Sequence, residues 1–181
     1  MEFDFGYIIN YILTYETGIP LVLFIGIIAV VCGIVLFLYY TRISTRTFVR
    51  KASICMFIGY VSLVICTTII FRTEYDEMKY VLCPLISYIG LYNKLLAQNI
   101  LNIVLFMPVG FFAGAALRKK HLLNVIKIGF VLSLSIELIQ LISRRGVCNI
   151  DDVIHNTLGC VLGFACFVLC LKMMRSHLKQ C

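Results

Sequence analysis

Two long stretches without a single charged residue constrain this sequence most strongly. Residues Ile19–Tyr40 and Ala52–Phe71 contain no Asp, Glu, Lys or Arg over 22 and 20 positions. An α-helix of about 20 apolar residues is long enough to cross the roughly 30 Å hydrocarbon core of a bilayer. We therefore expect each stretch to form a transmembrane helix.

Three further apolar stretches follow, at Gln98–Leu117, Leu122–Ile142 and Val153–Leu171. The chain is 61% hydrophobic and 14% charged, against about 45–50% and about 25% in soluble domains. Because 181 residues cannot bury that much apolar surface in water, the excess must face lipid. The sequence predicts an all-α, polytopic transmembrane bundle with about five spans, and it excludes a soluble enzyme domain.

No linker or internal repeat divides the chain, so we expect one membrane domain. Within it the predicted parts are an extracellular interfacial segment (1–18), two apolar helices (19–71), an outer loop or re-entrant segment (72–98), a three-helix core (98–174) and a cytoplasmic tail (175–181).

The positions of the basic residues predict the orientation. Residues 1–18 contain no Lys or Arg, whereas 41–51 contain four and 118–120 three, and the tail adds Lys172, Arg175 and Lys179. By the positive-inside rule the N-terminus lies outside and the C-terminus in the cytoplasm. The net charge of +7 then reflects cytoplasmic loops and anionic lipid head groups rather than nucleic acid. Arg144 and Arg145 would be outside, against the general trend.

Two segments are expected at the outer membrane surface. Phe3, Tyr7, Tyr11 and Tyr15 recur every fourth residue, which places them on one helical face. Such a stripe indicates an interfacial anchor; ligand stacking is the alternative. The apolar segment 80–96 is interrupted by Pro84, and either a surface or a re-entrant position fits it.

Cysteine usage argues against a metal site or a disulfide framework. Of the nine cysteines, six fall inside apolar stretches, where cysteine behaves as a small hydrophobic residue. The chain contains no CxxC pair, so we expect no metal and no cofactor. Cys83 and Cys148 lie in loops on the same predicted side, where a disulfide and two free thiols both remain open.

Polar residues inside the apolar stretches are the main functional candidates. A carboxylate at a helix centre costs roughly 2.5–3.5 kcal/mol on insertion scales, so it normally faces the bundle interior. Glu137 is the clearest case, and Ser133, Glu137, Gln140 and Arg144 follow the spacing of one helical stripe.

The fifth stretch shows a similar stripe. Asp152 and Asn156 share a helical face with Gly159 and Gly163, a GxxxG pair that permits close helix approach. Asp151 and His155 form the neighbouring stripe. Either aspartate could instead serve only as a helix cap near a positive dipole end.

The third stretch adds Asn99 and Asn102 on one face, followed by Pro108, which we expect to kink the helix. Three spans thus place polar groups at the same outer level, which indicates either an outer-leaflet pocket or hydrogen bonds between helices. The pocket candidates are Asn99, Asn102, Glu137, Gln140, Arg144, Arg145, Asp151, Asp152 and Asn156; the structural candidates are Pro108, Gly110, Gly159 and Gly163.

At these residues the chain resembles the VanZ-like family. The matching blocks are NILNIVLFMPVGFFAG, SLSIELIQLIS and NIDDVIHNTLGCVLGF, in that order, within residues 83–167. Carried over by position, the motif residues are Asn102, Pro108, Gly110, Glu137, Gln140, Asp152, Asn156 and Gly159. The chain departs from the family at Asn149, where many members have aspartate, and at Cys148, where many have an aromatic residue.

The resemblance implies a multi-pass protein of the bacterial cell membrane, without a settled chemical activity. The founding member confers low-level resistance to teicoplanin, a lipid-tailed glycopeptide that attacks cell-wall precursors. The leading hypothesis is a non-enzymatic protein whose outer pocket binds membrane lipid, a lipid-linked wall precursor or the lipoglycopeptide. The alternatives are an enzyme that uses Glu137 and Asp152 as an acid–base pair on a lipid-linked substrate, a small proton-coupled transporter, and a structural role in a larger complex. The sequence does not predict the oligomeric state.

Overall fold

The computed structural model describes residues 46–180 apart from 71, 73, 90–92 and 118–120. The expected first span, 19–40, and the aromatic stripe of residues 3–15 lie outside the described residues.

Four long helices form the described structure: α3 (Arg46–Ile65), α5 (Asn93–Ala116), α6 (Leu122–Ser143) and α7 (Ile150–Gln180). Four segments are long and apolar enough to cross a membrane: Arg50–Ile69, Lys94–Ala116, Leu122–Ser143 and Ile150–Met173. This confirms the all-α, membrane-helical fold class. The total of about five spans and the orientation stay predictions.

The helix boundaries differ from the sequence expectation at several points. Helix α5 begins at Asn93 rather than near 98, and it continues through Pro108. Helix α7 begins at Ile150 rather than Val153 and runs to Gln180. The hydropathy of a sequence identifies the apolar part of a helix that spans the lipid, and it misses polar turns that continue the helix on either side. Both helices are therefore longer than expected.

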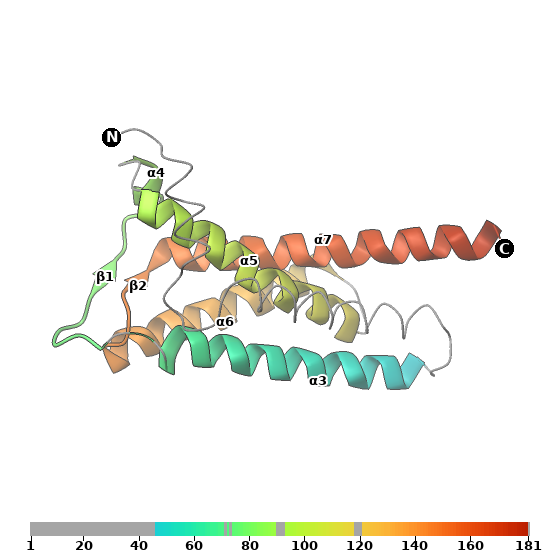
Figure 1. The fold of residues 1–181 in the computed structure, drawn as a ribbon, viewed down its shortest axis with the longest axis horizontal. Helices are drawn as coiled ribbons and strands as arrows, with labels where there is room; N and C mark the ends of the chain where they lie inside the picture. The colour runs from blue at the N-terminus through green and yellow to red at the C-terminus, as the bar shows by residue number, and fades with distance from the viewer. Residues whose placement is uncertain (1–45, 71, 73, 90–92, 118–120, 181) are drawn as a thin grey trace.

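The short elements gather at one end of the bundle, which we call the strand end (Figure 1). A π-helical turn, η1 (Cys66–Ile70), continues α3, and α4 (Ile86–Ile89) precedes α5. Strand β1 (Tyr80–Val81) pairs in parallel with β2 (Cys148–Asn149), with Tyr80 opposite Cys148 and Val81 opposite Asn149. The described residues of 74–89 therefore include a strand, a turn and the short helix α4.

Helices α5 and α7 both start at the strand end and cross in close contact (Figure 1). Three glycines lie at this crossing. A Cβ at Gly159 would overlap the carbonyl oxygen of Ile103, one at Gly163 that of Met107, and one at Gly110 that of Cys160. Small residues allow such backbone-to-backbone approach between membrane helices.

Aromatic packing and two long-range hydrogen bonds complete the helix core. The rings of Phe111 and Phe167 meet edge-on with centroids 5.4 Å apart, and Phe106 is fully buried. The Tyr60 hydroxyl donates to the Leu105 carbonyl at 2.8 Å, and Arg50 Nε donates to the Ala116 carbonyl at 3.2 Å. The two hydrogen bonds dock α3 on α5, and the aromatic contact joins α5 to α7.

Candidate functional site

Asn149 holds two of the carboxylates at the strand end, those of Glu137 and Asp152. Glu137 on α6 is 3% exposed, and its Oε2 accepts a hydrogen bond from the Asn149 backbone N–H at 2.7 Å. The Asn149 side chain donates from Nδ2 to Asp152 Oδ1 at 3.1 Å. A buried carboxylate requires such donors because burial removes its water.

One helical turn further from the strand end, a second polar contact joins α6 and α7. Asn156 donates from Nδ2 to Ser133 Oγ at 2.8 Å, and both residues are buried. Ser133 precedes Glu137 by four residues and Asn156 follows Asp152 by four, so each pair shares a helical face. We call the closed arrangement of Ser133, Glu137, Asn149, Asp152 and Asn156 the polar ring.

Helix α5 contributes two amide side chains, Asn99 and Asn102, of which Asn102 lies beside the ring. Asn99 is 2% exposed, and the side chain of Asn102 lies close enough to Asp152 to stabilise its negative charge. Among the described residues, Asn102 Nδ2 and Asn156 Oδ1 are buried atoms without a hydrogen-bond partner. Buried polar atoms in native proteins nearly always have a partner, so these two atoms are exceptions to the usual pattern.

Arg72 supplies a positive charge to the same site. Its guanidinium attracts the carboxylates of both Glu137 and Asp152 electrostatically, although it forms no ion pair with either within 4.0 Å. Arg72 was not among the site residues predicted from the sequence, because this residue lies in a loop without helical periodicity. Its position as the first charged residue after the stretch 52–71 is the signal that could have identified it.

Asn149 also caps helix α7. Its Oδ1 accepts the backbone N–H of Asp151 at 3.0 Å, the geometry of a residue that precedes the first helical turn. The structure therefore places the cap at Asn149 and not at Asp151 or Asp152, the alternative that the sequence left open. Both aspartates lie inside the first turn, where the helix dipole still favours their charge.

The turn before α4 is docked on the other face of α7. Asp151 Oδ1 accepts the N–H of Leu85 at 2.5 Å, and Leu85 has a left-handed backbone conformation, with φ of 59°. The His155 ring stacks on Tyr88, with centroids 5.8 Å apart.

His155 has a defined tautomer in this contact. Its Nδ1 lies 2.6 Å from the Asp151 carbonyl, and a carbonyl only accepts, so Nδ1 carries the proton. In the neutral ring Nε2 then accepts the Tyr88 hydroxyl at 2.8 Å. The Asp151–His155 stripe thus binds the α4 segment and lies beside the polar ring.

Gln140 lies on the same stripe as Ser133 and Glu137 but has a different partner. It is 2% exposed and donates from Nε2 to the Thr68 carbonyl of η1 at 2.6 Å. That carbonyl lies in the last turn of its helix, where partners from outside the helix are needed. Gln140 therefore joins α6 to the end of η1.

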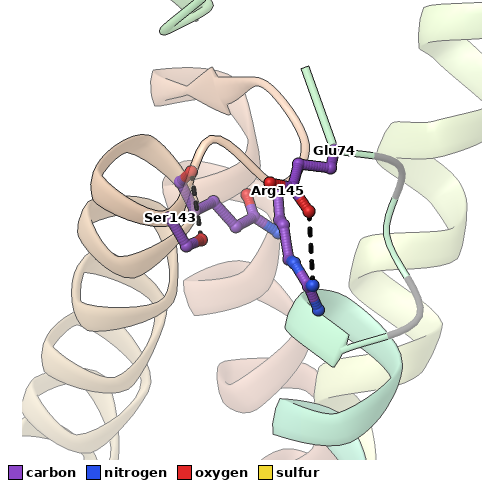
Figure 2. Close-up of polar contacts among 4 residues, drawn as sticks. Glu74, Ser143 and Arg145 are labelled. Carbon is purple, nitrogen blue, oxygen red and sulfur yellow. Dashed lines mark hydrogen bonds and ion pairs between the residues drawn. The ribbon is translucent and has the colours of Figure 1, made fainter. Parts of the chain in front are cut away.

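The two arginines after α6 lie outside the polar ring. Arg144 has φ of 56° at the helix C-cap, and its guanidinium donates to the Asp76 carbonyl at 3.1 Å. Arg145 pairs with Glu74 at 3.4 Å near the surface, as Figure 2 shows. These contacts fasten the 74–76 loop to the end of α6. The structure thus brings Asn102, Glu137, Asp152 and Asn156 together without Arg144 and Arg145.

Cys83 and Cys148 are both free thiols, so the disulfide that the loop positions allowed is absent. Burial raises the pKa of the Cys148 thiol, and the nearby carboxylates of Glu137 and Asp152 raise this pKa further. A raised pKa keeps the thiol protonated and slow to react at neutral pH. Among the described residues no group of three or more His, Cys, Asp and Glu could hold a metal ion.

Comparison with known proteins identifies the family of this chain. A sequence model of the VanZ/LLP1 family matches residues 21–171. The chain belongs to the VanZ/LLP1 family. The matched range contains the whole polar ring, and it confirms the resemblance drawn from the three sequence blocks.

The protein VanZ of Enterococcus faecium is 36% identical to this chain over 73 residues. That match covers 40% of this chain and 45% of the relative, so the chain matches less than half of the relative's length. None of the solved structures matches the chain.

Proposed function

We propose that this VanZ/LLP1 protein works in the bacterial cell membrane and alters how the cell surface interacts with lipoglycopeptides such as teicoplanin or with lipid-linked wall precursors. The polar ring is its binding site. In the proposed orientation the strand end faces outside, where both kinds of molecule are found.

One observation carries the proposal: among the described residues, two buried amide atoms, Asn102 Nδ2 and Asn156 Oδ1, have no partner beside the buried carboxylate of Glu137 and the half-buried carboxylate of Asp152. Hydrogen bonding between helices alone gives no reason for leaving them unsatisfied, since an unpaired buried polar atom costs about 1–3 kcal/mol. A ligand that bonds to both atoms would remove that cost.

The experiment is Glu137→Gln in a susceptible host that expresses the chain. Glutamine keeps the shape and an acceptor for the Asn149 N–H, so the bundle should fold and insert normally. If the carboxylate charge serves the ligand, the variant should return teicoplanin susceptibility to that of cells without the chain. Minimal inhibitory concentration and membrane abundance are measured together.

Glu74→Gln is the matched control, because it removes a carboxylate from the exposed pair with Arg145 and leaves the ring unchanged. It should retain full activity. A Glu137→Gln protein that is equally abundant and fully active would show that the charge is unnecessary, and the proposal would then be wrong.

A further inference from the structure

The segment from β1 to the end of α4 exposes large apolar side chains at the strand end (Figure 1). Tyr80 and Leu82 are each 64% exposed, and Leu85 and Tyr88 are nearly half exposed. The sequence contains no charged residue from 80 to 93. A cluster of exposed apolar side chains marks a surface that binds a partner or a membrane. We call this set the apolar edge: Tyr80, Leu82, Leu85 and Tyr88.

The polarity of the chain changes abruptly at the start of the apolar edge. The exposed residues just before it are mostly charged: Glu74, Asp76, Glu77 and Lys79. From Tyr80 onward the exposed side chains among the described residues are apolar until α4 ends. This order suits a chain that passes from water into a membrane surface, where tyrosine is enriched at the level of the head groups.

Two contacts with α7 set the depth of the apolar edge. Asp151 Oδ1 accepts the Leu85 N–H at 2.5 Å, and the Tyr88 hydroxyl bonds to His155 Nε2 at 2.8 Å. His155 follows the first residue of the Ile150–Met173 span by five positions, which is about 7.5 Å along a helix that rises 1.5 Å per residue. The edge therefore reaches the second turn of α7 and does not extend away from the bundle into water.

The surface of α7 beside this contact is apolar and exposed. Ile154 and Leu158 are the i−1 and i+3 neighbours of His155, and they are 42% and 43% exposed. Leu162 continues the same row one turn further along the span. Exposed apolar side chains on a membrane-spanning helix face lipid. Because Tyr88 is docked next to this row, the apolar edge continues the lipid-facing surface of α7.

Backbone groups of the segment are bonded to protein rather than left for water. Strand β1 pairs with β2, the Leu85 N–H bonds to the buried Asp151 carboxylate, and the Tyr88 N–H donates to the Leu85 carbonyl at 3.0 Å. Irregular backbone is tolerated at membrane depth only where such groups have partners in the protein. These bonds make the segment compatible with a position among lipids.

We propose that the apolar edge is a lipid-binding surface that lies in the plane of the membrane interface, with its side chains at the boundary between head groups and acyl chains. Interfacial segments insert about 5–10 Å into this boundary, and the depth along α7 agrees with that range. A re-entrant segment would instead approach the bilayer centre, roughly 15 Å from each edge of a 30 Å hydrocarbon core. Asp151 and His155 hold the edge at its depth. This proposal goes beyond the proposed function and does not depend on what the polar ring binds.

Tryptophan fluorescence provides the test, because the chain contains no tryptophan. Leu82→Trp places a single reporter on the apolar edge, and Glu77→Trp places the matched control in the exposed charged stretch. Each full-length variant is reconstituted in phosphatidylcholine vesicles whose acyl chains carry bromine either near the head group or near the methyl end. Iodide, present on both sides of the vesicle membrane, reports exposure to water.

Bromine near the head group should quench Leu82→Trp several-fold more strongly than bromine near the methyl end does. Glu77→Trp should be quenched by iodide and by neither lipid. Tyr80→Trp exchanges one aromatic residue for another on the same edge and repeats the measurement if Leu82→Trp does not fold.

Three results would overturn the proposal. Quenching of the edge reporters by iodide alone would place the edge in water, and stronger quenching by bromine near the methyl end would make the segment re-entrant. Protection from iodide and from both lipids would show that another protein or a second copy of the chain covers the edge. None of these readouts involves drug susceptibility, so this proposal and the proposed function can fail separately.

Discussion

At the scale of single residues, Asn149 has the largest number of roles in the strand end. It caps α7 through Oδ1, donates to Asp152 through Nδ2 and donates to Glu137 through its backbone N–H. An aspartate at this position could provide the same cap, because Asn and Asp are about equal as N-caps. It would lose the Nδ2 donor and add a third carboxylate to the ring. The Asn149 side chain therefore matters most for holding Asp152.

Asn149→Ala should lower the free energy of unfolding by about 1 kcal/mol through loss of the cap. It should also weaken the ring, because Asp152 loses a donor. Asn149→Ser restores a cap oxygen without the Nδ2 donor, so it should recover most of the stability and little of the ligand affinity. Denaturant unfolding in detergent beside ligand binding measures both. Full stability in Asn149→Ala would contradict the cap assignment.

The stripe residues could be predicted from the sequence because helical spacing is strict. Ser133, Glu137 and Gln140, like Asp152 and Asn156, recur at three- and four-residue intervals inside apolar stretches. The structure buries all of them except Asp152, which is half-buried. Arg72, Asn149 and Tyr88 could not be predicted in the same way. Arg72 lies in a loop, Asn149 in a two-residue strand and Tyr88 in a short helix. Only the tertiary fold brings them to the ring or to the neighbouring His155.

At the scale of elements, the crossing of α5 and α7 positions the site. Gly159 and Gly163 allow the backbone of α7 to contact the carbonyl groups of Ile103 and Met107. This approach sets how closely Asn102 lies to Asp152. Apolar periodicity predicts the helices, and the GxxxG spacing indicates a contact, but neither identifies the partner helix or its direction.

Gly163→Ala should lower stability by about 1–3 kcal/mol, a usual cost of overpacking, because the new methyl group would overlap the Met107 carbonyl. Gly59→Ala is the matched control, since a Cβ there has no neighbour within 4 Å. It should leave stability nearly unchanged. Thermal unfolding in detergent compares the two, and equal stabilities would show that α7 does not depend on this close approach.

At the scale of the whole molecule, the helices alternate in direction. The beginnings of α3 and α6 and the end of α7 lie opposite the strand end (Figure 1). In the sequence, the basic clusters at 41–51, 118–120 and 172–179 adjoin those three positions. By the positive-inside rule we therefore expect the polar ring on the external side, which is the side that the proposed function requires.

Cysteine labelling in intact cells tests this orientation most directly. Single cysteines replace Arg46, at the start of α3, and Asp76, an exposed residue at the strand end, in a chain whose own cysteines are replaced by alanine. An impermeant thiol reagent should label position 76 in intact cells and position 46 only after permeabilisation. Labelling at 46 with position 76 protected in intact cells would place the polar ring inside the cell and contradict the proposed function.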